Sequence, residues 1–226
     1  MDYSSILTDT KWNLIKELSE KEQTPTELAK KTNTSIANIS QQLKLLEAYG
    51  LVKKERKINN HQPGKPKTLF SINKKVSEIM VISKKFSMKK NLKPDYFQEA
   101  ILNANCLCEK KEDIYLLEKF IILNEEIVKK SKAIMIIKLN HNIIELLIIT
   151  TTENLTQIRE KYSNQELKDL DGEGKKIICW THTITEIEEG IKSHNDHFTQ
   201  IISELKPFLD KGTFFEKIKE LKNGTN

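Results

Sequence analysis

The chain has 226 residues, of which 38% are hydrophobic and 31% are charged. This length allows one large domain or two modest ones, and recurring aliphatic residues supply a core. No run of 18 apolar residues occurs, so no membrane-spanning helix is expected. The first seven residues lack a basic start followed by an apolar stretch, so no secretory signal is expected. Three cysteines, an odd and low count, favour reduced thiols and a cytoplasmic location.

The net charge of +5 is divided unevenly along the chain. Residues 1–93 carry 19 basic and 9 acidic side chains, a net of +10, whereas residues 94–226 carry 18 and 23, a net of −5. A basic front half indicates a polyanionic partner for that half alone. The alternative, lysines that only keep a surface solvated, remains open on charge alone.

Two helices are predicted in the first 32 residues. The first covers residues 9–19, where apolar side chains recur three apart. The second covers residues 25–32, after Thr24 as N-cap and with Glu27 as its capping-box partner. Asn33 then suits the left-handed conformation of a tight interhelical turn.

A third helix is predicted from its N-cap Ser35 to Tyr49, and Gly50 ends it. Its apolar stripe has the helical spacing 3, 4 and 3 and consists of Ile36, Ile39, Leu43 and Leu46. For Ile36, at the start of this helix, a core position is preferred, and contact with a thymine methyl group is the alternative.

The period then changes to that of strands at residues 51–56 and 67–72, which flank a basic, turn-rich loop at residues 59–66. Helix, helix, helix and hairpin is the order of a winged helix. Residues 73–90 return to a helical pattern, with Val76, Ile79, Met80 and Phe86 on one side. This helix is the expected dimer contact, and packing of its apolar side against its own domain is the alternative.

The pattern S-x-x-x-x-S-x-x-L-x-x-L-x-x-x-G-L-V runs from Ser35 to Val52, and residues 64–72 have the composition of a wing and its returning strand. Together they resemble the winged helix-turn-helix of ArsR/MarR-type transcriptional regulators, over about residues 8–75. The resemblance implies sequence-specific binding of double-stranded DNA, a homodimer on an inverted repeat, and repression as the expected outcome.

Burial of the apolar stripe turns the opposite face of the third helix outward, and such a helix enters the major groove with its N-terminal residues at the base edges. Asn and Gln amides there can pair with adenine. The expected DNA contacts on the helix are Ser35, Ala37, Asn38, Ser40, Gln41, Gln42 and Lys44. In the wing, phosphate or minor-groove contacts are expected from Arg56, Lys57, His61, Lys65 and Lys67. The alternative is an ordinary solvated surface.

We expect an α+β protein with three parts: residues 1–93, the winged helix with its following helix; 94–130, a helical linker or dimerisation segment; and 131–226, a small α/β domain for sensing or dimerisation. Helices are predicted near 95–107, 111–130, 153–162, 184–193, 196–208 and 213–222. Strands are predicted at 132–139, 143–150 and 175–181, with an acidic loop at 169–174.

Residues 143–150 resemble the acidic strand of minimal nucleotidyltransferases, and residues 175–181 resemble a later strand of that family. The family holds Mg²⁺ with two carboxylates on this strand, but here Ile143 occupies one position and only Glu145 remains. A Gly-Ser turn for the phosphates is missing too. The resemblance therefore implies a degenerate, non-catalytic domain that binds a nucleotide, a protein or its own twin. An unrelated α/β domain is the alternative.

Two rival functions remain open. The first is a nucleotidyltransferase-like enzyme, or an antitoxin-like protein, with a nucleic-acid-binding arm. The enzyme needs a second carboxylate beside Glu145, from Asp169, Asp171 or Glu173. The second rival is a module whose winged helix binds protein or RNA, and weak salt dependence on duplex DNA would favour it.

No metal ion or other cofactor is expected. Cys106 and Cys108 lack the usual zinc spacing. A site of Cys179 and three histidines (His182, His194 and His197) would depend on tertiary packing that the sequence does not predict. The expected partners are double-stranded DNA and a second copy of the chain, with no membrane partner, and the effector is left open.

Overall fold

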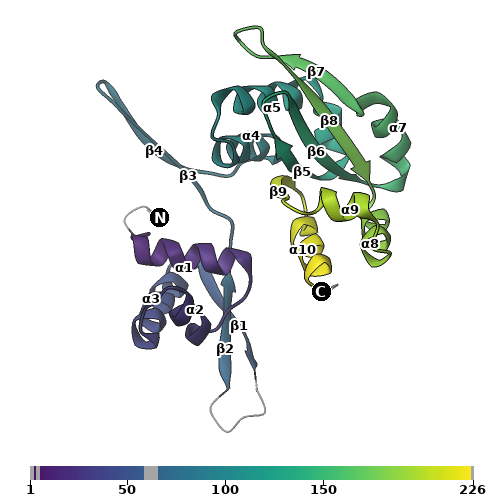
Figure 1. Ribbon diagram of the computed structural model, residues 1–226. Helices are drawn as coiled ribbons and strands as arrows, with labels where there is room; N and C mark the ends of the chain where they lie inside the picture. Colours follow the sequence, from purple (N-terminus) through teal and green to yellow (C-terminus); the bar gives the residue numbers. More distant parts are fainter. Residues whose placement is uncertain (1–2, 4–5, 59–65, 225–226) are drawn as a thin grey trace. The chain divides into compact units, whose positions relative to one another are not determined.

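The computed structural model describes Tyr3 and residues 6–58 and 66–224. The chain divides into two compact units, Met1–Lys93 and Pro94–Asn226 (Figure 1). Both units combine helices with antiparallel strands, which confirms the α+β class. Within the described ranges, no helix is both long and apolar enough to span a bilayer.

The first unit begins with three helices and a two-stranded antiparallel sheet, in the predicted order: α1 (Asp9–Glu20), α2 (Pro25–Lys31), α3 (Ile36–Ala48), β1 (Val52–Ile58) and β2 (Lys67–Ile72). One apolar core joins these elements, and its most buried members are Leu14, Leu28, Ile39, Leu43, Leu46 and Val52. The backbones of Gln23 and Phe70 also exchange two hydrogen bonds, which fixes the turn before α2 against β2.

Local chemistry sets the ends of these helices. The Thr24 hydroxyl accepts a hydrogen bond from the backbone N–H of Glu27, whose carboxylate accepts one from the Thr24 N–H, so the predicted capping box is present. Asn33 (φ 50°) and Gly50 (φ 68°) adopt the left-handed conformation, as predicted. The turn between α2 and α3 is therefore encoded locally.

The predicted helix over residues 73–90 is wrong. The structure has an antiparallel pair instead, β3 (Ser77–Ser83) and β4 (Phe86–Leu92), which we call the β3–β4 ribbon (Figure 1). The central residues Ile79–Ile82 are three β-branched residues and one methionine, which favour a strand. Lys84 and Lys85 form the turn between the two strands. The strands pair without a register shift, from the pair Ser77–Leu92 to the pair Ser83–Phe86.

The second unit is built on a five-stranded mixed sheet with the strand order β7-β8-β6-β5-β9. Only β6 and β8 are parallel, and α7 and β7 connect them. The elements are α4 (Tyr96–Leu107), α5 (Lys111–Leu123), α6 (Glu125–Lys130), β5 (Ser131–Leu139), β6 (Ile143–Thr150), α7 (Thr152–Tyr162), β7 (Asn164–Lys168), β8 (Gly174–His182), α8 (Ile184–Lys192), α9 (Asp196–Ile201), β9 (Lys206–Asp210) and α10 (Phe214–Gly224).

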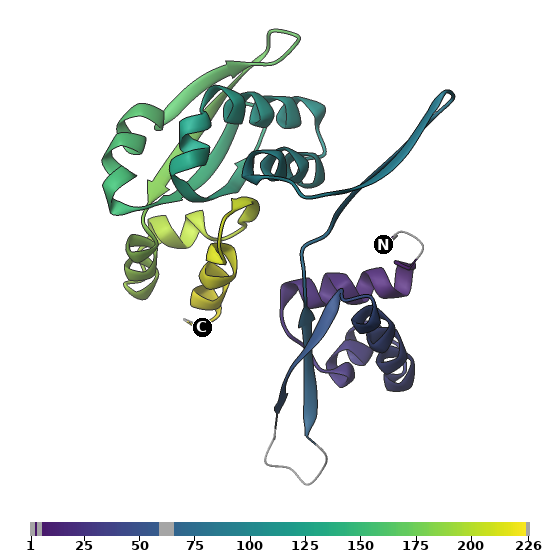
Figure 2. The same ribbon diagram turned by 180° about the vertical axis from the view of Figure 1, so that it is seen from behind.

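Helices cover both faces of this sheet (Figures 1 and 2). Alternate residues of β6 face opposite sides: Leu146 packs in the core with α4, α5, α6 and α7, and Leu147 in the core with α8, α9 and α10. Residues 94–130, expected as a separate linker, are thus part of this unit, because fully buried Ala100, Ala104 and Phe120 pack into its sheet.

Two further expectations at this level need correction, and one strand was missed. Residues 111–130 form two helices rather than one, with Asn124 between them. Residues 196–208 form α9 and then β9, because Pro207 cannot continue a helix and is tolerated in a strand at the edge of a sheet. The strand β7 was not predicted, and its Gln165 amide exchanges two hydrogen bonds with the Asn124 amide.

A buried ion pair ties α5 to β8. The Lys175 ammonium lies 2.6 Å from an Asp113 carboxylate oxygen, and their side chains are only 9% and 7% exposed. Lys175 also donates to the backbone carbonyl of Asn140 at 3.1 Å. Both charges therefore have partners where water is nearly absent.

Candidate nucleic-acid interface

The third helix is held by its buried back face. Ile39, Leu43 and Leu46 have no exposed surface, and the Ser35 hydroxyl caps the helix by accepting from the Asn38 backbone N–H at 3.3 Å. With that face fixed, the opposite face carries an exposed row four and three residues apart, namely Ala37, Gln41 and Lys44. These three and the N-cap Ser35 are the predicted contact residues of this helix that the structure leaves exposed.

Two of the predicted amide contacts lie to one side of that row. Asn38 and Gln42 are half-buried, and the Gln42 side-chain amide donates to Oδ1 of Asn38 at 3.1 Å. The Gln42 Oε1 atom is buried without a hydrogen-bond partner. Ser40 is also half-buried. Of the two adjacent glutamines, Gln41 therefore has the amide better placed for an external partner.

Ile36 is not a core residue, so the core position that its helical spacing predicted is wrong. Its side chain is 51% exposed in the first turn of α3, next to exposed Ala37. The core members of α3 begin one turn later, at Ile39, so the stripe does not reach the helix start. An exposed aliphatic group at this end fits the alternative role, contact with an apolar group of a partner.

The wing contributes fewer described residues than predicted. Arg56 on β1 and Lys67 on β2 are exposed. The side chain of Lys57, and all of His61 and Lys65, lie outside the described residues.

Other basic side chains of the strand β1 have acidic partners. Lys53 pairs with Glu55 and Lys54 pairs with Glu47, each at 2.7 Å. The hydrogen bond from Lys53, joined by one from Ser71, lowers the pKa of Glu55. Among the described wing residues, Arg56 and Lys67 are thus better placed for phosphate than the paired lysines.

Sequence reasoning missed one basic region. Residues 73–93 contain seven lysines and one glutamate, so +6 of the +10 net charge of the first unit lies there. The lysine count of this segment could have identified it as basic surface, but the helical interpretation assigned the segment to a dimer contact instead.

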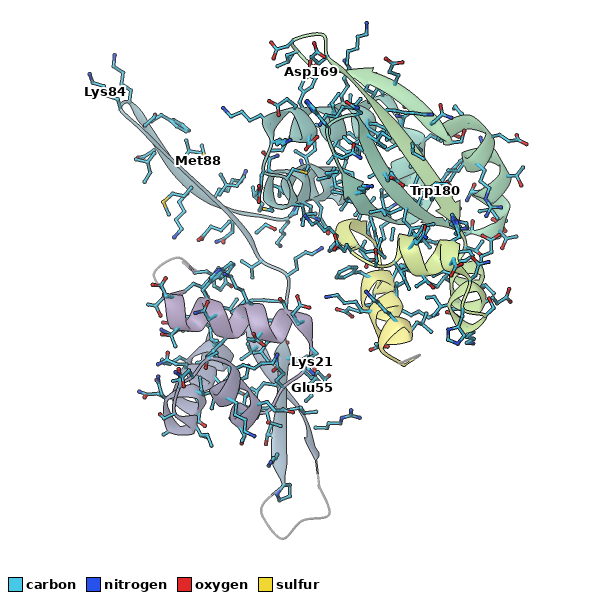
Figure 3. The ribbon with its side chains drawn as sticks, in the orientation of Figure 1. Lys21, Glu55, Lys84, Met88, Asp169 and Trp180 are labelled. Atoms are coloured by element: carbon cyan, nitrogen blue, oxygen red, sulfur yellow. The ribbon has the colours of Figure 1, made fainter. Side chains whose placement is uncertain are left out.

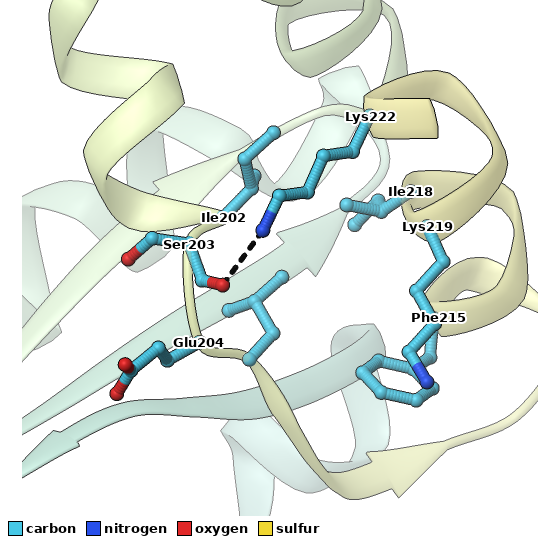
Figure 4. A pocket seen from close by; sticks show the side chains of 8 residues that line it. Ile202, Ser203, Glu204, Phe215, Ile218, Lys219 and Lys222 are labelled. Atoms are coloured by element: carbon cyan, nitrogen blue, oxygen red, sulfur yellow. Dashed lines mark hydrogen bonds between the residues drawn. The ribbon is translucent and has the colours of Figure 1, made fainter. Parts of the chain in front are cut away.

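In the second unit, the glutamate of the proposed acidic strand is engaged by an aromatic residue. The Trp180 indole N–H donates to Glu145 at 3.1 Å. The two line a cavity of about 370 Å³ together with His197 and Glu204. A second pocket, lined by Ile202, Phe215 and Lys222, is only about 100 Å³ (Figure 4), too small for a typical small-molecule ligand.

The carboxylates that the enzyme alternative requires lie elsewhere. Asp169 accepts hydrogen bonds from the backbone N–H groups of Asp171 and Glu173 and so closes the β7–β8 turn. This turn lies beyond Gly174, four residues along β8 from the partner of Glu145, which is about 13 Å of strand. Figure 3 shows Asp169 in the turn between β7 and β8, and Trp180 on β8 well away from that turn.

The cysteine and histidine cluster considered from the sequence is divided by the sheet. Cys179 lies in the core with α4 to α7, whereas His182 faces the other side with α9. Burial raises the pKa of the Cys179 thiol to about 12. The Nε2 atoms of His182 and His197 are 3.4 Å apart, but no group of three metal-ligating side chains occurs among the residues that the structure describes.

We expect His182 to make the second unit less stable in acid. Burial, aided by the positive Arg159 and by His197, lowers the pKa of His182, and Glu186 opposes this only in part. At a pH between the two pKa values, His182 is therefore protonated in the unfolded chain and neutral in the folded chain. The contribution of His182 to the free energy of unfolding should be constant above pH 6.5 and fall below it, by at most about 1.4 kcal/mol per pH unit.

Urea unfolding of wild type and His182→Gln between pH 5 and 7.5 measures this slope. The His182→Gln variant should have a flatter profile, and His141→Gln, at an exposed histidine in the β5–β6 turn, should retain the wild-type slope. Parallel profiles for wild type and His182→Gln would contradict the assignment.

Comparison with known proteins gives a family match within the first unit. The family model described as "Bacterial regulatory protein, arsR family" matches residues 8–54. No curated protein matches the sequence. Among solved structures, the ferric uptake regulator from Francisella tularensis with iron is 16% identical and has a TM-score of 0.24, over 39% of this chain and 68% of that one. A TM-score this low supports no conclusion about fold or ligand.

The matched residues cover α1, α2, α3 and the start of β1, the elements that position the exposed row of Ala37, Gln41 and Lys44. Residues 8–54 are therefore the helix-turn-helix of an ArsR-type winged helix, and the protein is a DNA-binding transcription regulator.

Proposed function

We propose that the protein is a sequence-specific repressor that binds an inverted repeat as a homodimer and reads each half-site with α3. The observation that carries this proposal is the exposed row on α3, where a small residue, an amide and a lysine lie above a fully buried back face. Ala37 leaves room for a base edge, the Gln41 amide can pair with adenine, and Lys44 can reach a phosphate.

Two copies are proposed because one α3 covers only a few base pairs. Helix-turn-helix dimers place two recognition helices one turn of DNA apart, which gives the operator its two-fold repeat. We assign the second unit to dimerisation or signal input rather than to nucleotide transfer. Ile143 supports this, because the strand then offers Glu145 alone where a transferase needs two carboxylates for magnesium.

The sharpest test uses the exposed glutamine. Gln41→Ala should weaken binding to the operator by about 5- to 150-fold, the equivalent of one good amide–adenine pair, and should leave binding to scrambled duplex almost unchanged. Fluorescence anisotropy with both duplexes, at matched salt, measures the two affinities.

Lys67→Gln is the matched contrast, since a phosphate contact carries no sequence information. It should weaken binding to both duplexes equally and lower the salt slope by about 0.9. Equal losses of affinity for operator and scrambled DNA in Gln41→Ala would contradict the assignment of Gln41 to base recognition. Weak binding with little salt dependence would favour a protein or RNA partner instead.

A further inference from the structure

The β3–β4 ribbon is an exposed two-stranded sheet, and within the described ranges no third strand pairs with it (Figure 1). Its register places Ile79, Val81, Phe86 and Met88 on one face, each 39–50% exposed. Ile82, at the far end of the other face, is 76% exposed. An isolated hairpin is only marginally stable in water, so a ribbon of this kind calls for a partner.

The charge on the ribbon indicates what that partner is. Residues 77–92 carry four lysines and one glutamate, Glu78, a net of +3, and residues 73–93 as a whole carry +6. Lys84 and Lys85 form the tip, and Lys89 pairs with Glu78 at 3.4 Å. A second copy of the ribbon has the same positive charge and would be repelled, whereas a polyanion would be attracted.

We propose that the β3–β4 ribbon is a second DNA-contacting element, a basic arm with two lysines at its tip and apolar side chains beside them, which lies in a groove of the duplex beyond the bases read by α3. This inference rests on the proposed function and extends its DNA surface.

The dimensions fit this assignment. Seven residues per strand give an arm of about 23 Å, and the major groove is wide enough to admit a two-stranded ribbon. Proteins that bind the minor groove also insert Ile, Met or Phe side chains against base steps. Ile82 and Phe86 flank the tip lysines and supply such groups. Lys84 and Lys85 then meet phosphates on either side.

The test is the salt dependence of binding by the full chain to a 30-bp duplex of random sequence, which requires no knowledge of the operator. The Lys84→Gln/Lys85→Gln variant should lower the slope of log K against log salt by about 1.8, the value for two phosphates. Between 50 and 200 mM salt, its loss of affinity should be about 12-fold smaller than that of wild type.

Lys110→Gln/Lys111→Gln is the matched control, because it removes an adjacent, exposed lysine pair from the second unit. It should keep the wild-type slope. Ile82→Ala should weaken binding several-fold at every salt concentration without changing the slope. Ile122→Ala, at a 59% exposed isoleucine of α5, should have no effect.

Equal slopes for the two lysine variants would overturn the inference. So would a change in sedimentation of the ribbon variants with an unchanged slope, which would make the ribbon a contact between copies. Wild-type protein that fails to bind duplex DNA would instead contradict the proposed function, so the two failures are distinguishable.

Discussion

Asp113→Ala is expected to lower the free energy of unfolding by about 3–5 kcal/mol, one of the largest effects of any single substitution in this chain. The change leaves the Lys175 ammonium in a site where it is 9% exposed and keeps only the Asn140 carbonyl as a polar partner. An uncompensated buried charge costs more than the lost attraction alone. Urea unfolding followed by circular dichroism measures the difference.

A double variant tests whether the loss of stability comes from the unpaired charge or from the altered packing. Asp113→Leu with Lys175→Met removes both charges at similar volume and should be close to neutral. The pair Lys129–Glu125 on α6, with side chains 71% and 62% exposed, is the surface comparison. Glu125→Ala should cost well under 1 kcal/mol. An Asp113→Ala loss as small as that would show that water reaches the Lys175 ammonium.

Ala37→Glu is expected to abolish useful DNA binding while leaving the fold intact. The new carboxylate would lie on the exposed row of α3 and face the negative duplex, where like charges in contact cost several kcal/mol, or 100-fold or more in affinity. The same substitution should raise the free energy of unfolding slightly, because a negative charge in the first turn of a helix is stabilising by about 0.3–1 kcal/mol. Anisotropy and thermal unfolding measure the two effects on one sample.

Ala48→Glu is the control on the same helix. Ala48 is exposed in the last turn, where a negative charge is slightly destabilising and where groove contacts are not expected. It should lose a little stability and much less DNA affinity than Ala37→Glu. If the two variants lost the same affinity, binding would depend on net charge rather than on the N-terminal end of α3.

The helix-turn-helix could be predicted closely because its signals are local. Thr24 and Glu27 cap α2, Ser35 caps α3, and Asn33 and Gly50 take the left-handed turns that their side chains allow. Each signal depends on residues within one turn of chain. None requires knowledge of what packs against the element from a distance.

The misses arise where tertiary contacts or propensity outweigh periodicity. Apolar residues three and four apart suggested a helix at residues 73–90. The run Ile79–Ile82 nevertheless favours a strand, and residues 86–92 form the strand that pairs with it. Phe208 and Leu209 also matched a helical period, but they are fully buried in β9 because β5 offers hydrogen bonds at that edge. Short apolar runs do not distinguish the two structures.

The candidate interface was predicted as a set of residues but not as a geometry. Spacing alone put Gln41 and Gln42 on equal terms, and only packing shows that Gln42 turns toward Asn38. Ile36 matched the buried stripe and is nevertheless exposed, because the core of this unit takes up α3 only from Ile39 onward. The buried pair of Asp113 and Lys175 joins residues 62 apart in sequence, a separation at which no local rule operates.

The three thiols differ in their access to solvent, and this gives the chain a built-in attachment point. Cys108 and Cys179 are buried, whereas Cys106 is exposed on α4. A maleimide dye added to the folded protein should therefore label the second unit at one position. With a second dye on the DNA end, energy transfer would report how far that unit lies from the duplex, and whether a small molecule changes this distance, without any engineered residue.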